Sequence, residues 1–300
     1  MTRLAAWWFA PGPAARLAAV RILVGGFALA WLVGRLPELL AVARLPAASW
    51  HPTGVTRLLA GPLPAGVVVA TAGLTCALLV GVVVGAWYRV TAPAAAVLLL
   101  GVLTYRSSWG MVFHTENLLV LHLLALAAAP AADVWAWDAR GGARPAPAAG
   151  WGWPLKLLTA LTVITYVLAG IAKLRLAGWG WLDGEQLRNQ IAIDNLRKAL
   201  LGDGVAPLGR LFLEHPAGFA VFSVLTLVLE LGAPVALAGP RIARGFAAIA
   251  WGFHLGVVLL MNIWFVYPLA GIAYASMLPV ERPVGAVGRR LARVIRRTRE

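Results

Sequence analysis

Charged residues are scarce in this 300-residue sequence. Only 13% of the residues are Asp, Glu, Lys or Arg, whereas about a quarter are charged in a typical soluble domain. Hydrophobic residues make up 61% of the chain, and the mean hydropathy is +0.80. A water-soluble fold cannot bury this much apolar surface, so the composition excludes a soluble protein and predicts one that is integral to a membrane.

Acidic residues are the scarcer of the two charge classes. Twelve Asp and Glu stand against 26 Lys and Arg, which gives a formal net charge of +14. In a soluble protein this excess would suggest nucleic acid as a partner. Here much of it lies in short loops and in the last twenty residues, where positive-inside topology and anionic lipid explain it. We therefore expect the lipid bilayer as a partner and no nucleic acid.

Cysteine is almost absent. The single cysteine, Cys76, lies in an apolar run and can form no intramolecular disulfide. The sequence has no CxxC motif, which excludes thiol redox chemistry and zinc clusters. One lysine and two histidines without paired carboxylates also make a poor set of metal ligands. We expect no metal.

Long apolar runs dominate what the sequence does contain. Runs of spanning or near-spanning length predict an all-α, polytopic integral membrane bundle of about eight helices. We expect a membrane domain over residues 1–280 and a basic tail over 281–300, and we expect the first apolar run to remain as a membrane helix. The predicted spans cover residues 16–36, 65–87, 92–105, 115–131, 155–174, 217–238, 243–261 and 263–279.

The distribution of arginine orients these spans. Eight crossings place both termini on one side of the membrane, and the tail holds six arginines from Arg289 to Arg299. The positive-inside rule assigns that side to the cytoplasm. The sequence thus predicts a multi-pass protein of the cell membrane with both termini cytoplasmic.

Two amphipathic helices are predicted outside the spans. The loop 175–216, on the outer face, has Asp183 as a possible N-cap and Gln186 at capping-box spacing, followed by a helical pattern that ends in glycine. A second helix begins near Val284 and carries valines and leucine on one face and arginines on the other. That pattern is typical of a cationic helix that lies on a membrane surface.

Polar groups within the apolar runs are few, and each is a functional candidate because burial in a membrane is costly. Thr162, Tyr166 and Lys173 share one face of the fifth predicted span, as helical spacing requires. Such a stripe is expected to face the interior of the bundle or a cavity. The other polar residues in the spans are Arg21, His114, Asn117, His122, Ser223, Thr226, Glu230 and His254.

The predicted topology also gives these groups a depth. His114 begins the fourth span and Lys173 ends the fifth, so both are expected near the outer face. His254 falls in the middle-to-outer part of its span, and Glu230 falls in the inner half of its own. We expect three basic groups around one outward-facing cavity.

Each of these residues also has a purely structural interpretation. Lys173 could be a snorkelling anchor at the membrane surface, and the histidines could be partners in interhelical hydrogen bonds. Arg21 is expected to be structural, paired with Glu230 or with backbone carbonyls. Glu230 is then either that counter-ion or a proton-relay group.

Several stretches resemble a known family. "YVLAGIAKL" followed by "WLDG" resembles the signature of the vitamin K-dependent γ-carboxylase superfamily and of its bacterial relatives, the horizontally transferred transmembrane (HTTM) domain proteins. The same resemblance extends, in order, over "ARLAAVRILVGG", "SSWGMVFHTENLLVLHLL", "LELGAPVAL" and "GFHLGVVLL". It covers residues 15 to about 279.

The resemblance implies a carboxylase-like enzyme and a set of site residues. Lys173 takes the position of the base that deprotonates the cofactor, a reduced quinone such as vitamin K hydroquinone or menaquinol. His114 and His254 take positions that assist this chemistry or stabilise the developing anion. The pocket residues that it implies are Trp109, Asn117, Tyr166 and Glu230.

A lysine must be neutral to act as a base, and burial away from counter-charges favours the neutral amine. No Asp or Glu lies within a helical turn of Lys173, and the nearest in the sequence is Asp183. This absence suits a neutral base. It equally suits a simple anchor.

The sequence departs from the carboxylase in one major respect, and other functions stay open. The carboxylase carries a large lumenal domain after its membrane part, and we expect none here because an arginine tail follows the last span. Carboxylation of an acceptor therefore remains an open part of the hypothesis. The alternatives are a non-enzymatic membrane factor for maturation or export of a secreted peptide, and a small-solute carrier.

Overall fold

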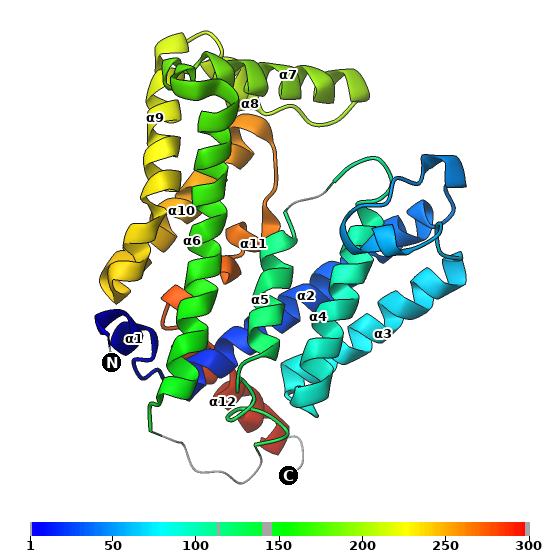
Figure 1. Ribbon diagram of the computed structural model, residues 1–300, viewed down its shortest axis with the longest axis vertical. Helices are drawn as coiled ribbons and strands as arrows, with labels where there is room; N and C mark the ends of the chain where they lie inside the picture. The colour runs from blue at the N-terminus through cyan, green and yellow to red at the C-terminus, as the bar shows by residue number, and fades with distance from the viewer. Residues whose placement is uncertain (1, 113–114, 140–145, 298–300) are drawn as a thin grey trace. The chain divides into compact units, whose positions relative to one another are not determined.

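The computed structural model describes residues 2–112, 115–139 and 146–297, and these residues form helices joined by turns (Figure 1). The chain divides into two compact parts: one comprises residues 1–158 with 279–300, and the other comprises residues 159–278. The boundary falls inside helix α6 (Ala149–Ala177). Each part is described by itself.

Six helical segments are long and apolar enough to cross a membrane. They confirm an all-α, multi-pass membrane architecture and correspond to six of the eight predicted spans. The six are α2 (Ala14–Val42), α3 (Ala65–Val84), α4 (Tyr88–Arg106), α6 with the 3₁₀ turn η3 (Gly178–Asp183), α9 (Pro216–Gly232) with η4 (Ala233–Ala238), and α10 (Pro240–Met261).

The other two predicted spans take different forms. The fourth contains α5 (Asn117–Ala127), which has only 11 residues. The eighth, 263–279, is not a continuous helix: it is divided into α11 (Val266–Leu269) and the 3₁₀ turn η5 (Ile272–Met277). Pro268 and the left-handed Gly271, at φ +74°, interrupt it.

Both predicted amphipathic helices are present. The loop 175–216 contains α7 (Glu185–Leu201), which ends at Gly202 in the left-handed conformation. Its N-cap is Gly184 rather than Asp183, but the Asp183 carboxylate accepts the Glu185 N–H at 2.9 Å. The tail forms α12 (Glu281–Arg297), three residues earlier than predicted. The remaining short elements are α1 (Arg3–Trp8), η1 (Ala47–Ser49), η2 (Gly54–Leu58) and α8 (Pro207–Phe212).

In the first part, α2, α3, α4 and α5 pack in sequence order, and Arg21 holds them together. The Arg21 side chain is fully buried and donates four hydrogen bonds to backbone carbonyls. Two of those carbonyls, of Val82 and Val83, belong to the last turn of α3, where the regular i+4 hydrogen bonds of the helix end, and the Val82 carbonyl also accepts the Gly85 N–H at 3.2 Å. Arg21 was predicted to pair either with Glu230 or with backbone carbonyls. The carbonyl prediction is confirmed, and the Glu230 prediction is wrong.

Carboxylate side chains bind both ends of α4 in this part. Asp138 accepts the N–H groups of Trp87 and Tyr88 at 2.9 and 2.8 Å and so caps the start of α4. At the other end of α4, the buried Arg106 binds Glu38 at 2.7 Å and Glu116 at 3.1 Å. These contacts join α2, α4 and the residue before α5.

In the second part, α9 and α10 pack with the C-terminal portion of α6, and α7 lies across one end of them (Figure 1). Residues 262–278 return along α6 and α10 as the interrupted segment. Its irregular backbone is bonded by side chains: Thr162 donates to the Ala273 carbonyl at 3.0 Å, and Trp251 donates to the Leu269 carbonyl at 2.9 Å. Such bonds allow non-helical backbone to lie among membrane helices.

Candidate functional site

An ion pair joins α6 to α9. The Nζ of Lys173 lies 2.6 Å from Oε1 of Glu230. Gly170, one turn before the lysine, allows the two helices to approach, because a Cβ at that position would lie 2.8 Å from Leu231 and 3.1 Å from the Cβ of Glu230. The small residue in "YVLAGIAKL" is thus what brings the carboxylate within reach of the amine.

The pair corrects two predictions about Lys173. The fifth span does not end at residue 174, because α6 continues to Ala177 and then through η3 to Asp183. Lys173 consequently lies inside the spanning segment rather than at its edge. The expectation of an amine without a nearby carboxylate is also wrong, since Glu230 approaches from another helix at the same depth.

The two members of the pair differ in their surroundings. The Glu230 side chain is 3% exposed, and its second oxygen, Oε2, has no hydrogen-bond partner among the described residues. The Lys173 side chain is 23% exposed, and its Nζ lies 5.5 Å from the ring centre of Trp181. The indole of Trp181 is fixed in turn by a bond to the Ser223 carbonyl at 3.3 Å. The site therefore has an amine held between a carboxylate and an indole, and a buried carboxylate oxygen that is unpaired among the described residues.

A second polar group lies among α6, α10 and the interrupted segment. The Tyr166 hydroxyl is 2.9 Å from Nε2 of His254 and 2.7 Å from the Tyr274 hydroxyl, and all three side chains are buried. The other ring nitrogen of His254, Nδ1, has no partner in the described part of the chain. The three groups form a short hydrogen-bonded chain that ends in a free imidazole nitrogen.

An apolar groove of about 1010 Å³ lies along α9 and α10 beneath α7 and α8. Thr226 is the one lining residue with a polar side chain, and it precedes Glu230 by one helical turn. Phe246 lines the groove and packs edge-on against Tyr166 at 5.3 Å, while Phe253 lines it and contacts His254 at 5.3 Å. The groove suits the hydrocarbon chain of a lipid, and it lies beside both polar groups.

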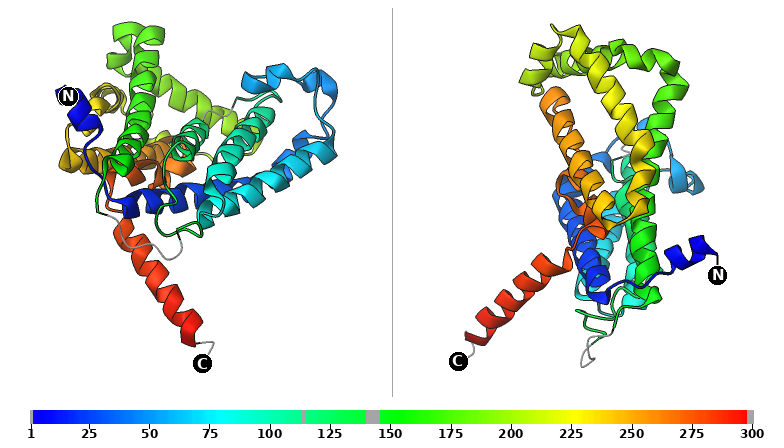
Figure 2. Two further views of the ribbon diagram at one scale, coloured as in Figure 1. Left: turned by 60° about the horizontal axis from the view of Figure 1, so that its bottom comes forward. Right: turned by 90° about the vertical axis from the view of Figure 1, so that its left-hand side faces the viewer.

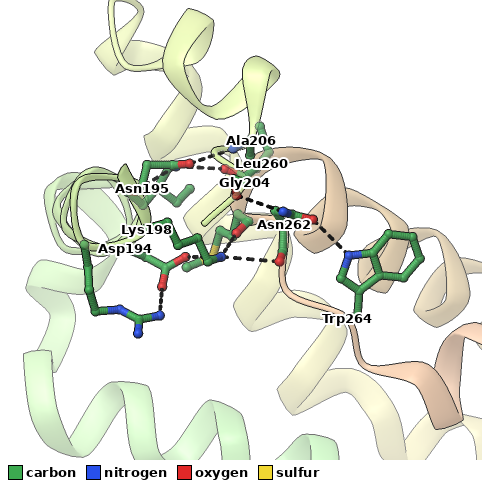
Figure 3. A network of polar contacts seen from close by, with 11 residues as sticks. Asp194, Asn195, Lys198, Gly204, Ala206, Leu260, Asn262 and Trp264 are labelled. Atoms are coloured by element: carbon green, nitrogen blue, oxygen red, sulfur yellow. Dashed lines mark hydrogen bonds and ion pairs between the residues drawn. The ribbon is translucent and has the colours of Figure 1, made fainter. Parts of the chain in front are cut away.

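Figure 3 shows a network that fixes α7 against the C-terminal end of α10. Lys198 binds Asp194 at 2.7 Å and also donates to the carbonyls of Met261 and Asn262. Asn195 donates to the Leu260 carbonyl at 3.3 Å and accepts the Ala206 N–H at 2.9 Å. A cation and an amide thereby satisfy the free carbonyls at the negative end of α10.

This network gives α7 a pH dependence. Burial alone would raise the pKa of Asp194, but hydrogen bonds from Lys198 and Arg197 outweigh it and hold the pKa below its ordinary 3.8. A depressed pKa contributes stability that is present above 3.8 and is lost as the pH falls through the lower folded value. Asp194→Asn is expected to lower the free energy of unfolding at pH 6 by about 1 kcal/mol.

Thermal unfolding of the two proteins between pH 2.5 and 7 checks this expectation. The gap in melting temperature is expected to close as the pH falls below 3.8. Glu185→Gln, at the exposed first position of α7, serves as the control and should change little. A gap that stays constant over the whole range would contradict the assignment.

The structure gathers four of the seven predicted site residues in one part of the chain: Tyr166, Lys173, Glu230 and His254. Trp109 and Asn117 belong to the other part. Trp109 packs against Trp50 and Tyr105 at ring distances of 5.1 and 5.8 Å, and Asn117 is the exposed first residue of α5. His114 lies outside the described residues.

Sequence analysis missed several residues around these sites. Tyr274 was not predicted as a site residue because the eighth span was expected to be an ordinary helix. The network at the end of α10 was not predicted because nothing in the sequence connects Asn262 with the helix that carries Asn195 and Lys198. The signal that was available was Asn262 next to the end of an apolar run, since asparagine adopts the left-handed conformation, here φ +49°, more readily than most residues.

A protein-family model matches the sequence of this chain. The HTTM domain model covers residues 9–278, which is most of the chain. The chain belongs to the HTTM domain family. No curated protein and no solved structure matches it. The family model thus spans every helix of the HTTM protein from α2 to η5, including both polar groups.

Proposed function

We propose that this HTTM protein is a carboxylase-like membrane enzyme in which the Lys173–Glu230 pair takes up the proton of a lipid quinol. The observation that carries the proposal is the pair itself. It unites a lysine at the family-like position with a buried carboxylate 2.6 Å away, and the second carboxylate oxygen has no hydrogen-bond partner among the described residues. The resemblance to the carboxylase suggests the type of reaction, and the contacts of the ion pair suggest how the proton is taken up.

A paired lysine can serve as a base because the pair carries no net charge. In a low-dielectric site the proton can reside on either member, as ammonium with carboxylate or as amine with carboxylic acid. In the second of these forms the amine of Lys173 can accept one more proton, which gives an ammonium beside a carboxylic acid. That ammonium is placed to stabilise negative charge left where the proton came from.

The residues present fit a quinol with a long apolar chain. The groove beside α9 and α10 suits the chain, and Phe246 and Phe253 connect its wall to Tyr166 and His254. When bound, the quinol would supply the acidic hydroxyl and the electrons for reaction with oxygen. Tyr166 and Tyr274 would hold the imidazole of His254 in one orientation, which leaves Nδ1 to bind a ligand oxygen.

Lys173→Arg is expected to lower the rate of epoxide formation at least 100-fold. Arginine retains the charge and the partner but does not lose its proton. The assay uses purified protein in lipid nanodiscs with reduced menaquinone or vitamin K hydroquinone in air. The affinity for quinone, measured by quenching of tryptophan fluorescence, is expected to change less than threefold. Lys156→Arg, on the same helix, is the matched control and should keep both properties.

Two results would overturn the proposal. Full activity of Lys173→Arg would remove the lysine from the chemistry. Tight quinone binding without any epoxide, in folded protein, would leave a binding or assembly role in the maturation or export of a secreted peptide. Whether an acceptor is also carboxylated is tested in the same assay with labelled carbon dioxide and a glutamate peptide.

The interrupted segment 262–278 favours a small-solute carrier as the second candidate, because carriers often use broken helices at their binding sites. The described groove is apolar, however, and the backbone of the segment is bonded by Thr162 and Trp251. We also place both termini in the cytoplasm, on the strength of the arginine-rich tail, and the protein in the cell membrane.

A further inference from the structure

Helix α12 has two opposite faces that its own part of the chain leaves largely uncovered. Val287 and Val294 are 57% and 58% exposed, which is unusual for large apolar side chains. They are seven residues apart and so lie on one face of the helix. Arg282, Arg289 and Arg293 occupy the other side, Arg290 borders the valine face, and all four of these side chains are exposed.

The start of α12 is tied to the end of a membrane-spanning helix. Glu281 accepts two hydrogen bonds from the guanidinium of Arg16, at 2.9 and 2.8 Å. Arg16 lies in the first turn of α2, which begins at Ala14 and is long enough to span. Because a spanning helix ends near the lipid headgroups, the first turn of α12 lies at that level too.

Beyond this attachment, α12 extends away from the other helices of its part (Figure 2). Its 17 residues correspond to a length of about 25 Å. Gly285 lies against the ring of Trp135, so the close packing is confined to the first turns. The remaining turns carry the exposed valines and most of the arginines. Glu281, the only acidic residue of the helix, is already paired with Arg16.

We propose that α12 binds the anionic lipid surface beside the start of α2, with its valine face in the acyl boundary and its arginines on lipid phosphates. Three observations favour lipid over an acidic protein. The chain itself is embedded in a bilayer by six spanning helices. The helix begins at headgroup level. Apolar residues opposite a fully cationic face are typical of helices that lie in a membrane interface.

This surface is independent of the Lys173–Glu230 site. Nothing in the proposed quinol chemistry requires α12, and all residues of that site belong to the other part of the chain. The two proposals can therefore fail separately. The lipid surface also predicts orientation, because α12 is expected on the leaflet that carries anionic lipid.

The experiment places a fluorescent label on either face of α12 in the full-length protein. Val287→Cys and Arg289→Cys are compared in a Cys76→Ala background, in nanodiscs of phosphatidylcholine alone or with 30% phosphatidylglycerol. Quenching by lipids brominated on their acyl chains reports depth. In anionic discs the label at 287 is expected to be quenched at least threefold more than that at 289. The difference should shrink in neutral discs and in 1 M salt.

A second measurement needs no label and no substitution. Trypsin cleavage after Arg289, Arg290 and Arg293 of the wild-type protein is expected to be at least tenfold slower in anionic than in neutral nanodiscs. Cleavage at equal rates, together with equal quenching at 287 and 289 in both lipids, would overturn the proposal. That outcome would indicate that the exposed faces of α12 bind a protein partner instead of lipid.

Discussion

Lys173→Met is expected to lower the free energy of unfolding by about 3 kcal/mol or more, whereas the double variant Lys173→Met with Glu230→Leu is expected to regain most of that loss. Removing one member of a buried ion pair leaves an uncompensated charge, which typically costs about 3–5 kcal/mol. Replacing both members by apolar groups of similar size removes the charge and its desolvation together.

The exposure of the two side chains makes the effect unequal. Glu230 is 3% exposed and cannot reach water when the amine is removed. Lys173 is 23% exposed, and its long stem allows the ammonium to turn toward solvent when the carboxylate is removed. Glu230→Leu alone is therefore expected to cost about 1–2 kcal/mol, less than Lys173→Met.

Titration of the purified protein with sodium dodecyl sulfate in mixed micelles measures these free energies. The cycle of two single variants and the double variant is expected to give a coupling energy of at least about 2 kcal/mol. Leu168→Met, on the exposed side of the same helix, is the matched control and should change stability by less than about 0.5 kcal/mol. A double variant whose loss equals the sum of the two single losses would show that the pair is not coupled.

This cycle also separates folding from chemistry. The double variant is expected to fold and to lack activity entirely, because it has lost both proton carriers. Lys173→Arg is expected to be nearly as stable as the wild type, since arginine retains the ion pair. An inactive but stable Lys173→Arg variant would thus assign the loss to proton transfer rather than to unfolding.

The sequence predicted the local elements of this fold well, because they depend on neighbouring residues. Apolar runs of about twenty residues predict spanning helices whatever lies beside them, and six such helices are present. The pattern after Asp183 predicts α7, and the arginine-rich tail predicts α12. The polar stripe of Thr162 and Tyr166 was correctly expected to face inward.

Features that depend on which helices are neighbours were not predictable in the same way. The Lys173–Glu230 pair joins residues 57 positions apart, and its existence depends on the approach at Gly170 and on the length of α6. A 3₁₀ extension to Asp183 has no clear signature in the sequence. It places Lys173 within the spanning segment rather than at the predicted edge. The contact with Glu230 also shows that the different depths predicted for the two residues are wrong.

The interrupted segment shows a different limit. Residues 263–279 are as apolar as a spanning helix, so hydropathy alone predicts one. Pro268 and Gly271 interrupt this stretch, although both residue types are tolerated in membrane helices, and partners such as Thr162 and Trp251 then bind the irregular backbone. Tyr274 reaches Tyr166 because of this break. The hydrogen-bonded chain to His254 is consequently a product of tertiary structure.

Arg21→Met is expected to be the most damaging single substitution in the first part of the chain. It removes all four hydrogen bonds that Arg21 donates, to the carbonyls of Val82, Val83, Ala131 and Trp135 at 2.6–3.0 Å. A buried carbonyl that loses its partner costs about 1–3 kcal/mol. The sum is comparable with the whole stability of a typical domain, so we expect a large fall in the yield of folded protein.

Arg21→Lys is expected to retain part of this function. Val82 and Val83 are both bound by Nη1, so a single ammonium can reach that pair of carbonyls, but not also those of Ala131 and Trp135. A melting temperature between those of Arg21→Met and the wild type, measured by fluorescence-detected size exclusion, would agree with this geometry. Arg89→Met, an exposed arginine at the start of α4, is the control and should behave as the wild type.

The reason for this sensitivity is that a guanidinium has no substitute at the site. Its planar fork reaches the end of α3 and two carbonyls of the connection after α5 at once. The neighbouring Gly85 leaves room for it, since a Cβ there would lie 2.8 Å from Nη1 and 2.4 Å from the Cβ of Ala136, at a φ of +69°. Gly85→Ala is accordingly expected to lower the melting temperature, as Arg21→Lys does. Wild-type stability in both variants would mean that the four carbonyls find other donors, and that Arg21 is not what holds α2 to α3.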